Sequence, residues 1–559
     1  MRRSNVVVLV LALIVGITAT GVVLSRRGGD DPRPNASASP TATPAATVTA
    51  SPTVTASASP TARPTPTGPG PRNRQYDVVY ARGVSADAGA AAVAALNGEV
   101  IHENAKVGVA TVRANPGFVA AAMRDRRIHG VYTNRAVGRP PAIDEDRASE
   151  RGQGVDRANL ADLQWDMSAI NVPEAHRRTK GDKRVIVAVL DTGVDGKHPD
   201  LAAAFDRELS RNFVTDYPGA DGPCEVRTCV DPNDVDGDGH GTHVAGTIAA
   251  ADDGRGITGV APGVRLVNLR TGQDAGLFFL MATVDALVYA GDIGVDVANM
   301  SYYLDPWLFN CPDAANDSAE ERYEQRAAIE GVRRAVDYAY AKGVTLVAAA
   351  GNEGLDLTNP RVDDTSPNFP DDTAKVRAVD NDCLVLPSEL PHVIQVSAVG
   401  RDDVLTSYSN WGRGQIAVTA PGGSRVANGQ DSTQNLVLST YPESLARGED
   451  AIRTDGTSRS PGLASSCVRG TCAYYRWFNG TSMAAPHVTG VAALIVSMFG
   501  TDDPAHPGTL RMDPAAVEKR LRDTARALAC PRTRQCQGTR ESNGFYGNGL
   551  VDADAATRR

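Results

Sequence analysis

Largely apolar runs alternate with helical segments from residue 151 to the C-terminus. Such runs are typical of strands that are covered on both faces of a sheet. Between them, residues 318–343 place Ala328, Val332, Ala335 and Ala339 on one helical face. Strand–helix alternation predicts an α/β fold, a doubly wound parallel sheet with ligand sites at the carboxyl ends of its strands. The predicted strands are VIVAVL (185–190), VRLVNL (264–269), VDVANM (295–300), VTLVAAA (344–350) and VIQVSAV (393–399).

Residues 74–141 follow a different pattern, and we expect a separate small domain there. The order of expected elements is β-α-β-β-α-β, a ferredoxin-like α+β unit. Its segments are the strand YDVVYARG, the helix AGAAAVAALNG, two strands in EVIHENAKVGVATVRA, the helix PGFVAAAMRDRR that begins at a proline, and the strand HGVYTNR.

The N-terminal 73 residues predict export and a spacer. The apolar run at 6–24 is about long enough to span a bilayer, and arginines flank it on both sides. Residues 1–27 are therefore either a signal-anchor or a cleaved signal peptide, and both place the rest of the chain outside the membrane. Residues 28–73 are rich in Pro, Ala, Ser and Thr and predict an extended, solvated linker.

Charge and cysteine content indicate which partners the protein can have and in which cellular compartment it lies. The chain has 559 residues, a net charge of −9 and no basic block with interleaved aromatics, so nucleic acid is not an expected partner. Its eight cysteines form three pairs that are close in sequence, which leaves Cys311 and Cys383 as the fourth pair. Zinc binding is the alternative, but none of the pairs has C-x-x-C spacing, and small loops of this kind favour disulfides outside the cytosol. The close pairs are Cys224/Cys229, Cys467/Cys472 and Cys530/Cys536.

Three phrases carry an aspartate, a histidine and a serine that could act together. They are DTGVDGKHPDL (191–201), HGTHVAGT (240–247) and GTSMAAPHVTGVAAL (480–494). A serine hydroxyl becomes a nucleophile when a base takes its proton, histidine suits that task, and a carboxylate fixes the useful imidazole tautomer. Asp191 stands directly after a predicted strand, so we expect the three residues to meet at one strand-end crevice.

These phrases resemble the subtilisin family of serine peptidases, and a fourth phrase, AAAGNEG (348–354), matches it too. The resemblance covers about residues 155–553, which we expect to form a peptidase domain at 155–559. It implies that Asp191 is the orienting acid, His240 the general base and Ser482 the nucleophile. It also implies that Asn352 and the Ser482 backbone N–H form the oxyanion hole.

The resemblance implies a substrate-binding rim as well, with Ser301 and Gly351 as substrate-binding residues. A peptide is expected to add there as a strand. The sequence departs from the family at SYYLDPWLFNC (301–311) and at GQDAGLFFL (272–280), so the family's side-chain preference does not transfer.

No metal is expected in the catalytic site, and no cofactor is required for the chemistry. DVDGDG (234–239) starts like a calcium loop, but position 12 is Ala245 rather than a bidentate glutamate, which excludes an EF-hand. A looser structural calcium site or a solvated acidic loop remain as alternatives. His240 and His243 lack the H-E-x-x-H glutamate and spacing of a zinc site.

The other conspicuous residues have structural interpretations. His198, His243 and His487 are expected to be packed rather than catalytic. The stretch YYRWF (474–478) is expected either to line a substrate cleft or to form a packed hairpin, and residues 278–290 a core helix.

Taken with the resemblance, residues 74–141 predict a propeptide inhibitor, and 142–154 a polar linker that is cut during processing. The expected function is an extracellular, self-processing serine endopeptidase that acts on proteins or peptides. Its partners would be those substrates and its own propeptide, with a possible membrane anchor before processing. The alternatives are a narrow-specificity maturation protease and a non-catalytic, stalk-mounted binding module.

Overall fold

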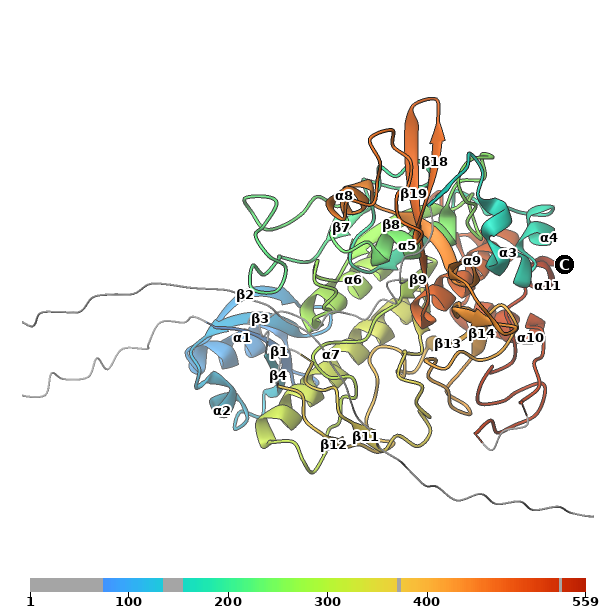
Figure 1. Cartoon of the computed structure of the whole chain (residues 1–559). Helices are drawn as coiled ribbons and strands as arrows, with labels where there is room; N and C mark the ends of the chain where they lie inside the picture. The colour runs from blue at the N-terminus through green and yellow to red at the C-terminus, as the bar shows by residue number, and fades with distance from the viewer. Residues whose placement is uncertain (1–73, 134–153, 369–372, 532–534) are drawn as a thin grey trace, which may run out of the picture. The chain divides into compact units, whose positions relative to one another are not determined.

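The computed structural model describes residues 74–133, 154–368, 373–531 and 535–559. Its centre is a seven-stranded sheet in the order β14-β13-β10-β9-β6-β8-β7 (Figure 1). Every neighbouring pair in it is parallel. The five predicted strands are all present, as β6 (Ile186–Leu190), β8 (Arg265–Arg270), β9 (Val297–Met300), β10 (Thr345–Ala349) and β13 (Val393–Val399), with β7 (Arg211–Asn212) and β14 (Val418–Pro421) at the edges.

Helices cover both faces of this sheet, which confirms the doubly wound α/β fold. On one face α5 (His240–Ala249) and α9 (Thr481–Phe499) share a core with Val187 and Val189 of β6. On the other face α6 (Leu280–Asp292) and α7 (Ala319–Ala341) pack against the alternate residues of the same strand. Both helices were predicted from their periodicity. Smaller helices complete the first face, namely α3 (Trp165–Ala169), α4 (Val172–His176), α10 (Pro514–Thr524) and α11 (Ala553–Thr557).

Helix α9 begins with Thr481 and Ser482 and then runs through the middle of this core. Among the residues that the structure describes, it is the one helix long and apolar enough to cross a membrane, and most of it is buried against the sheet and its neighbours. The apolar run at 6–24 lies outside the described residues.

The N-terminal unit has the predicted β-α-β-β-α-β order, and its sheet runs β2-β3-β1-β4. Its second helix, α2, is shorter than expected and has only Phe118 and Ala122 buried, because the charged residues after Met123 leave no apolar stripe for a second turn. The elements are β1 (Arg74–Tyr80), α1 (Ala86–Ala95), β2 (Glu99–Asn104), β3 (Val109–Ala114), α2 (Phe118–Ala122) and β4 (Ile128–Thr133).

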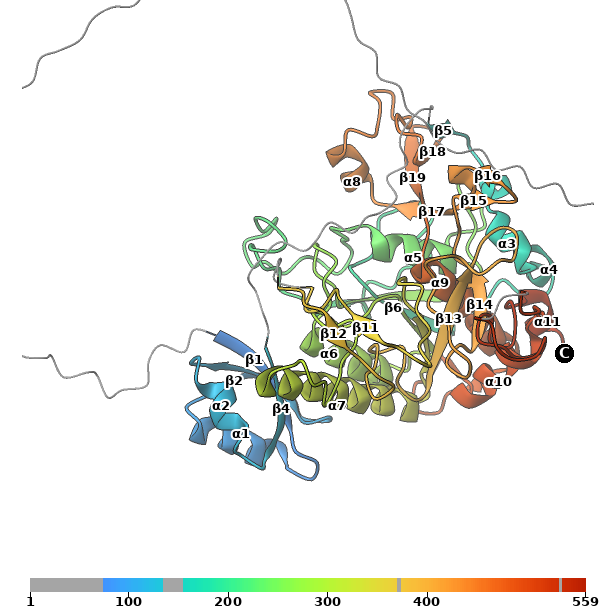
Figure 2. The ribbon, with the colours of Figure 1, turned by 60° about the horizontal axis from the view of Figure 1, so that its bottom comes forward.

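The two faces of this small sheet have different neighbours. Tyr76 and Val78 of β1 pack with α1 and α2, whereas Val79 packs with α6 and α7 of the large unit. Figure 2 shows α7 beside β4. Arg334 of α7 donates to the carbonyls of Tyr80 (2.9 Å) and Val107 (3.0 Å), so the contact is polar as well as apolar.

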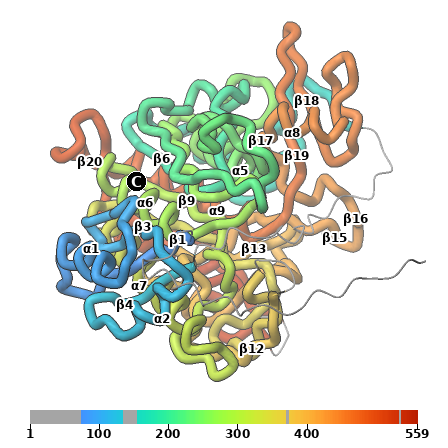
Figure 3. The backbone as a smooth tube through the Cα atoms, turned by 90° about the vertical axis from the view of Figure 1, so that its left-hand side faces the viewer, coloured from blue at the N-terminus to red at the C-terminus, as the bar shows by residue number. Residues whose placement is uncertain are grey.

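A second antiparallel layer, β17-β19-β18, stands beside the large sheet and ends in a hairpin (Figure 3). Its elements are β17 (Val437–Tyr441), α8 (Glu443–Gly448), β18 (Leu463–Val468) and β19 (Thr471–Phe478), and β5 (Val155–Asp156) pairs with β18 in parallel. All eight cysteines form the four predicted disulfides, which excludes the zinc alternative.

Candidate active site

The predicted site residues lie at adjacent strand ends on one side of the large sheet. Asp191 directly follows β6 and Ser301 directly follows β9, its neighbour, while Asn352 comes three residues after β10. His240 is the first residue of α5, and Ser482 is the second residue of α9. Except for the buried Asp191, these residues line one cleft with a volume of about 1230 Å³, and Gly351 lines it too.

Asp191 holds the imidazole of His240. The Nδ1–H of His240 donates to Asp191 Oδ1 at 2.7 Å, and the Thr192 backbone N–H donates to the same oxygen at 2.8 Å. Gly241 permits this approach, because a Cβ there would lie 2.1 Å from the Gly193 carbonyl oxygen. The contact leaves Nε2 as the ring nitrogen that faces the cleft in a neutral histidine.

The charged form of His240 is favoured in this environment. Burial disfavours the imidazolium, but the negative charge and hydrogen bond of Asp191 outweigh burial, and Asp238 and Asp236 add to the effect. Together they raise the pKa of His240 from 6.5 to about 9. Its side chain is 25% exposed, so solvent and substrate can still reach the ring.

Asn352 and Ser482 present hydrogen-bond donors to the same point. Asn352 Oδ1 accepts from the Thr481 N–H (2.9 Å) and from Thr481 Oγ1 (2.8 Å), which turns Nδ2 away from Thr481. The Ser482 N–H belongs to the first turn of α9, whose N–H groups lack intrahelical acceptors. At Gly480 (φ +147°) a Cβ would lie 3.4 Å from Asn352 Nδ2 and 3.6 Å from the Ser482 nitrogen, so glycine keeps this space open.

Comparison with known proteins identifies the family. The model of the subtilase family matches residues 182–549, about two thirds of the chain. The chain belongs to the subtilase family. It is thus a member of a family of serine endopeptidases, whose catalysis requires no cofactor.

Among its relatives is fervidolysin of Fervidobacterium pennivorans, 28% identical over 445 residues, or 74% of this chain and 51% of the relative. The chain therefore spans about half the length of that relative. Subtilisin Savinase of Lederbergia lenta is 28% identical over 394 residues, 70% of this chain and 98% of the relative. The crystal structure of an epidermin leader peptide processing serine protease from Staphylococcus aureus has the same fold, with a TM-score of 0.59, 22% identity and coverage of 87% of this chain and 97% of that one.

The Ser482 side chain of this subtilase lies against the end of β9. Ser482 Oγ donates to the Ser301 carbonyl at 3.0 Å, and Ser301 Oγ donates to the Ser482 carbonyl at 3.0 Å. Asn299 Nδ2 donates to Ser301 Oγ (2.9 Å), and Thr489 Oγ1, two turns along α9, donates to Asn299 Oδ1 (2.9 Å). Among the hydrogen bonds of these described residues, none joins Ser482 to His240.

The backbone N–H and carbonyl of Gly351 both form hydrogen bonds within the protein. Its N–H donates to Thr481 Oγ1 (3.1 Å), and its carbonyl accepts from the Asn410 N–H (3.0 Å). Its φ of +101° and the side chain of Asn410, which a Cβ would meet at 2.3 Å, both require glycine. Thr481 thus supports Gly351 and Asn352 together, a role that the sequence analysis did not assign although the residue stands within the quoted GTS phrase.

His198, His243 and His487 are buried and packed, as predicted. His243 Nε2 donates to the carbonyls of Arg476 (3.0 Å) and Val437 (3.2 Å), and burial lowers its pKa to about 3. His198 Nε2 donates to the Tyr474 carbonyl at 3.0 Å. His487 lies between the Met483 carbonyl and the buried carboxylate of Asp166.

The DVDGDG segment supports the start of α5. Asp236 is buried and accepts from the N–H groups of Gly239 (2.9 Å) and Thr242 (2.8 Å), and Asp238 accepts from the His240 N–H (3.0 Å). Carboxylates at a helix N-terminus satisfy its free N–H groups and complement its dipole. Asp234 forms ion pairs with Lys197 and Arg207. The loop is therefore engaged with the protein, and the expectation of a solvated acidic loop is wrong for Asp234 and Asp236.

A different acidic group could be suspected of holding calcium. Within the described residues, oxygens of Asp216, Glu225, Asp231 and Asp274 lie within 4.8 Å of one another. The guanidinium of Arg270 donates to three of them at 2.9 Å each, so an internal cation already occupies this position.

Both interpretations of the 474–478 stretch hold, for different residues. Tyr474 and Tyr475 are buried in the β18–β19 hairpin beside the Cys467–Cys472 disulfide, whereas Trp477 and Phe478 line the cleft. The rim segments 272–280 and 301–311 also meet there, because the Phe278 and Tyr302 rings stack with centroids 4.2 Å apart.

Proposed function

We propose that this subtilase hydrolyses peptide bonds through Asp191, His240 and Ser482, with Asn352 and the Ser482 N–H as the oxyanion hole. The observation that carries the proposal is the 2.7 Å bond between His240 Nδ1 and Asp191, in a cleft that also holds Ser482 and the donors of Asn352. Neutral His240 takes the Ser482 proton at Nε2 while Oγ attacks the scissile carbonyl. The negative charge that develops on the carbonyl oxygen is bound by Asn352 Nδ2 and the Ser482 N–H.

The two halves of the reaction use the same groups. The imidazolium, stabilised by Asp191, gives its proton to the leaving amine and leaves an acyl ester on Ser482. A water molecule then attacks the acyl carbon while it loses a proton to His240. The ester bond to Ser482 breaks, His240 returns the proton to Ser482 Oγ, and the acid is released. Before the first step the Ser482 hydroxyl must turn from the Ser301 carbonyl to His240, a rotation about one side-chain bond.

We also infer that the chain is made as a zymogen that cuts itself. The described part of the N-terminal unit reaches Thr133, whose N–H donates to Glu324 at 2.9 Å, while the adjacent Tyr132 hydroxyl donates to the carbonyl of Asp305 in the cleft wall. The described chain resumes at Gly154, packed against Ser458, two residues from the cleft-lining Ser460. The described residues that flank the 134–153 segment thus lie near residues of the cleft wall, which supports a cut in this segment by the chain's own serine.

Export is part of the proposal. The four disulfides support an extracellular protein. The apolar run at 6–24 would direct the chain across the membrane, and a cut in the 134–153 segment would release the peptidase from any anchor.

A fluorophosphonate probe tests the chemistry directly. The exported protein should be labelled at Ser482, and the Ser482→Ala and His240→Ala variants should not be labelled, although they remain folded. An unlabelled wild type that has lost its first 150 residues would overturn the enzyme assignment and favour the binding module. Casein digestion then separates a broad protease from a narrow maturation protease, which would leave casein intact.

A further inference from the structure

One part of the cleft holds two carboxylates that lack a cationic partner. Glu353 follows Asn352 and Asp305 lies four residues after Ser301, and both line the cleft. Glu353 Oε2 accepts from Asn410 Nδ2 (2.6 Å), and Asp305 accepts from Asn368 Nδ2 (2.6 Å) and from the Phe278 N–H (2.6 Å). All of these donors are neutral amides. Within the described residues no lysine, arginine or histidine forms an ion pair with either carboxylate.

Two further acidic residues of the cleft wall lie in the 443–462 segment, and each forms an ion pair with an arginine. Glu449 pairs with Arg476, and Asp450 pairs with Arg459. Glu353 and Asp305 differ from these two in having no cationic partner among the described residues, and burial raises the pKa of both carboxyl groups, that of Asp305 to about 7. The remaining acidic residue of the cleft wall, Asp238, accepts from the His240 N–H at the start of α5.

Tyr303 and Asn368 add neutral hydrogen-bonding groups between these carboxylates. Asn368 Nδ2 also donates to the Tyr303 hydroxyl oxygen at 2.9 Å, so the hydroxyl proton is not used in that bond. Burial first, and then the negative charges of Asp305 and Glu353, raise the pKa of Tyr303. Asn368 Oδ1 is buried and accepts no hydrogen bond from the described residues. A donor that enters from the cleft would satisfy this oxygen.

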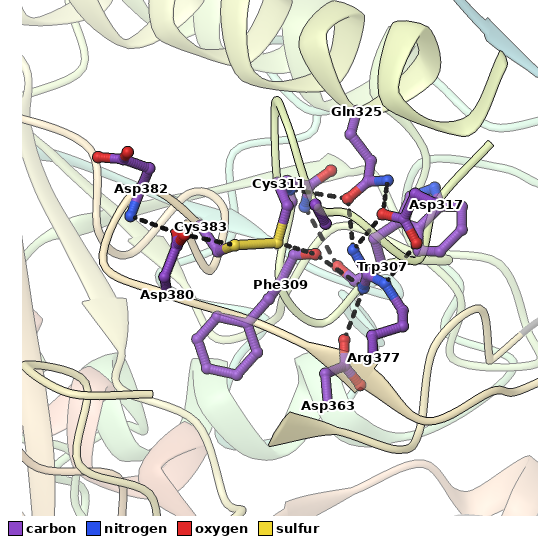
Figure 4. The surroundings of a disulfide bond; sticks show 12 residues. Trp307, Phe309, Cys311, Asp317, Gln325, Asp363, Arg377, Asp380, Asp382 and Cys383 are labelled. Atoms are coloured by element: carbon purple, nitrogen blue, oxygen red, sulfur yellow. Dashed lines mark hydrogen bonds and ion pairs between the residues drawn. A yellow bond between two sulfur atoms is a disulfide. The ribbon is translucent and has the colours of Figure 1, made fainter. Parts of the chain in front are cut away.

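The wall that carries these groups is rigidly built. The Asn368 N–H donates to the Pro306 carbonyl (2.9 Å), which ties the Asn368 segment to that of Asp305. Below them the buried guanidinium of Arg377 joins Asp317, Asp363 and the Phe309 carbonyl beside the Cys311–Cys383 disulfide (Figure 4). A pocket whose polar groups are fixed before the ligand arrives is suited to select one chemical class.

We propose that this pocket binds the cationic side chain of a lysine or arginine in the substrate, at the residue that supplies the scissile carbonyl. The position follows from the pocket's neighbours. Asp305 is in the segment that follows Ser301, whose carbonyl accepts from Ser482 Oγ. Glu353 directly follows Asn352, the proposed oxyanion donor. A cation there pairs with Glu353 and Asp305 and donates to Asn368 Oδ1. The inference rests on the proposed peptidase function and specifies its substrate class.

The chain's own sequence provides substrates of this class. The 134–153 segment, in which the processing cut is proposed, contains Arg135, Arg139, Arg147 and Arg151. Arg139 precedes a proline, so the other three are the preferred sites of the cut.

The test compares matched peptide substrates on the processed enzyme. Active sites are first counted with a fluorophosphonate, and kcat/KM is then measured for peptides that differ only in Lys, Arg, Leu, Phe or Glu before the scissile bond. Lys and Arg should be preferred over Leu at least tenfold, and Glu353→Gln should reduce that preference roughly tenfold, the usual effect of losing one charge-assisted hydrogen bond. Asp364→Asn, an exposed residue of the same segment, is the control and should leave the ratio unchanged.

The outcomes separate the two levels of the proposal. If the fluorophosphonate counts no active sites, the peptidase function itself has failed. If active sites are present and Leu or Phe is preferred, or if Glu353→Gln leaves the preference for Lys and Arg unchanged, the cationic pocket is refuted while the peptidase function stands.

Discussion

The hydroxyls of Ser482 and Ser301 are bound to each other's backbone carbonyls, each at 3.0 Å. This reciprocal pair ties the first turn of α9 to the end of β9. In the proposed mechanism it is the resting position from which the Ser482 hydroxyl turns to His240. Because Asn299 and Thr489 continue the chain of hydrogen bonds inside the core, the position of Ser482 depends on buried residues that never meet substrate.

Loss of the Ser301 hydroxyl should therefore slow the chemical step. We expect Ser301→Ala to lower kcat about tenfold with little change in KM, because the hydroxyl positions the nucleophile. Steady-state kinetics on titrated active sites would show this split. Ser397→Ala is the matched control, a buried serine of the same sheet that bonds the Phe545 carbonyl instead, and it should leave kcat intact. A purely raised KM in Ser301→Ala would contradict the positioning role.

Loss of the side-chain donor of Asn352 should lower kcat more than loss of the Ser301 hydroxyl. Asn352→Ala should lower kcat by about 10²–10³, the range known for this donor in subtilisin, with KM little affected. Thr481→Val removes the hydroxyl that bonds Asn352 Oδ1 and should lower kcat by a smaller factor. If Asn352→Ala kept full activity, the oxyanion would have to be bound by other groups.

Activity should rise with pH up to about 9. His240 acts as a base only when neutral, and Asp191 raises its pKa to about 9, so the active fraction grows as pH rises through that value. The acidic limb of the kcat/KM profile should lie well above 6.5. Asp191→Asn removes the negative charge and should move this limb to lower pH while lowering the maximal rate. A wild-type limb at or below pH 6.5 would show that Asp191 does not stabilise the imidazolium.

Much of this arrangement could be predicted from sequence, because local patterns determine it. The apolar runs at 185–190 and 344–350 place Asp191 and Asn352 at strand ends, and the periodicity of 318–343 predicts α7. Phrases around His240 and Ser482 match the family, and the structure brings these residues to one cleft.

Other features depend on contacts between distant segments, which leave no local pattern. The bond of Ser482 to Ser301 crosses 181 positions, and the capping of α5 by Asp236 depends on the path of the preceding loop. The helix expected over PGFVAAAMRDRR is longer than α2, because the charged residues after Met123 provide no apolar side chains for a second turn. The residues of the Glu353–Asp305 pocket likewise come from three separate segments.

The Cys311–Cys383 disulfide should matter more for stability than the short ones. It closes a loop of 72 residues, whereas Cys224–Cys229 closes one of 5. Loop closure predicts a loss of about 4 kcal/mol on removing the first and about 2 kcal/mol on removing the second. Denaturant unfolding of the double Cys→Ala variants on a Ser482→Ala background, which avoids self-digestion, would measure both. Equal losses would argue against the closed loop as the source of the stability.

The central claim is that Ser482 makes the chain a self-processing peptidase. The most direct test is the intact mass of the exported protein, wild type beside Ser482→Ala, with Ser497→Ala of the same helix as the control. We predict that the wild type and Ser497→Ala lose the N-terminal region by a cut within residues 134–153, and that Ser482→Ala keeps it. Identical cleavage of wild type and Ser482→Ala would contradict the claim, because another protease would then be making the cut.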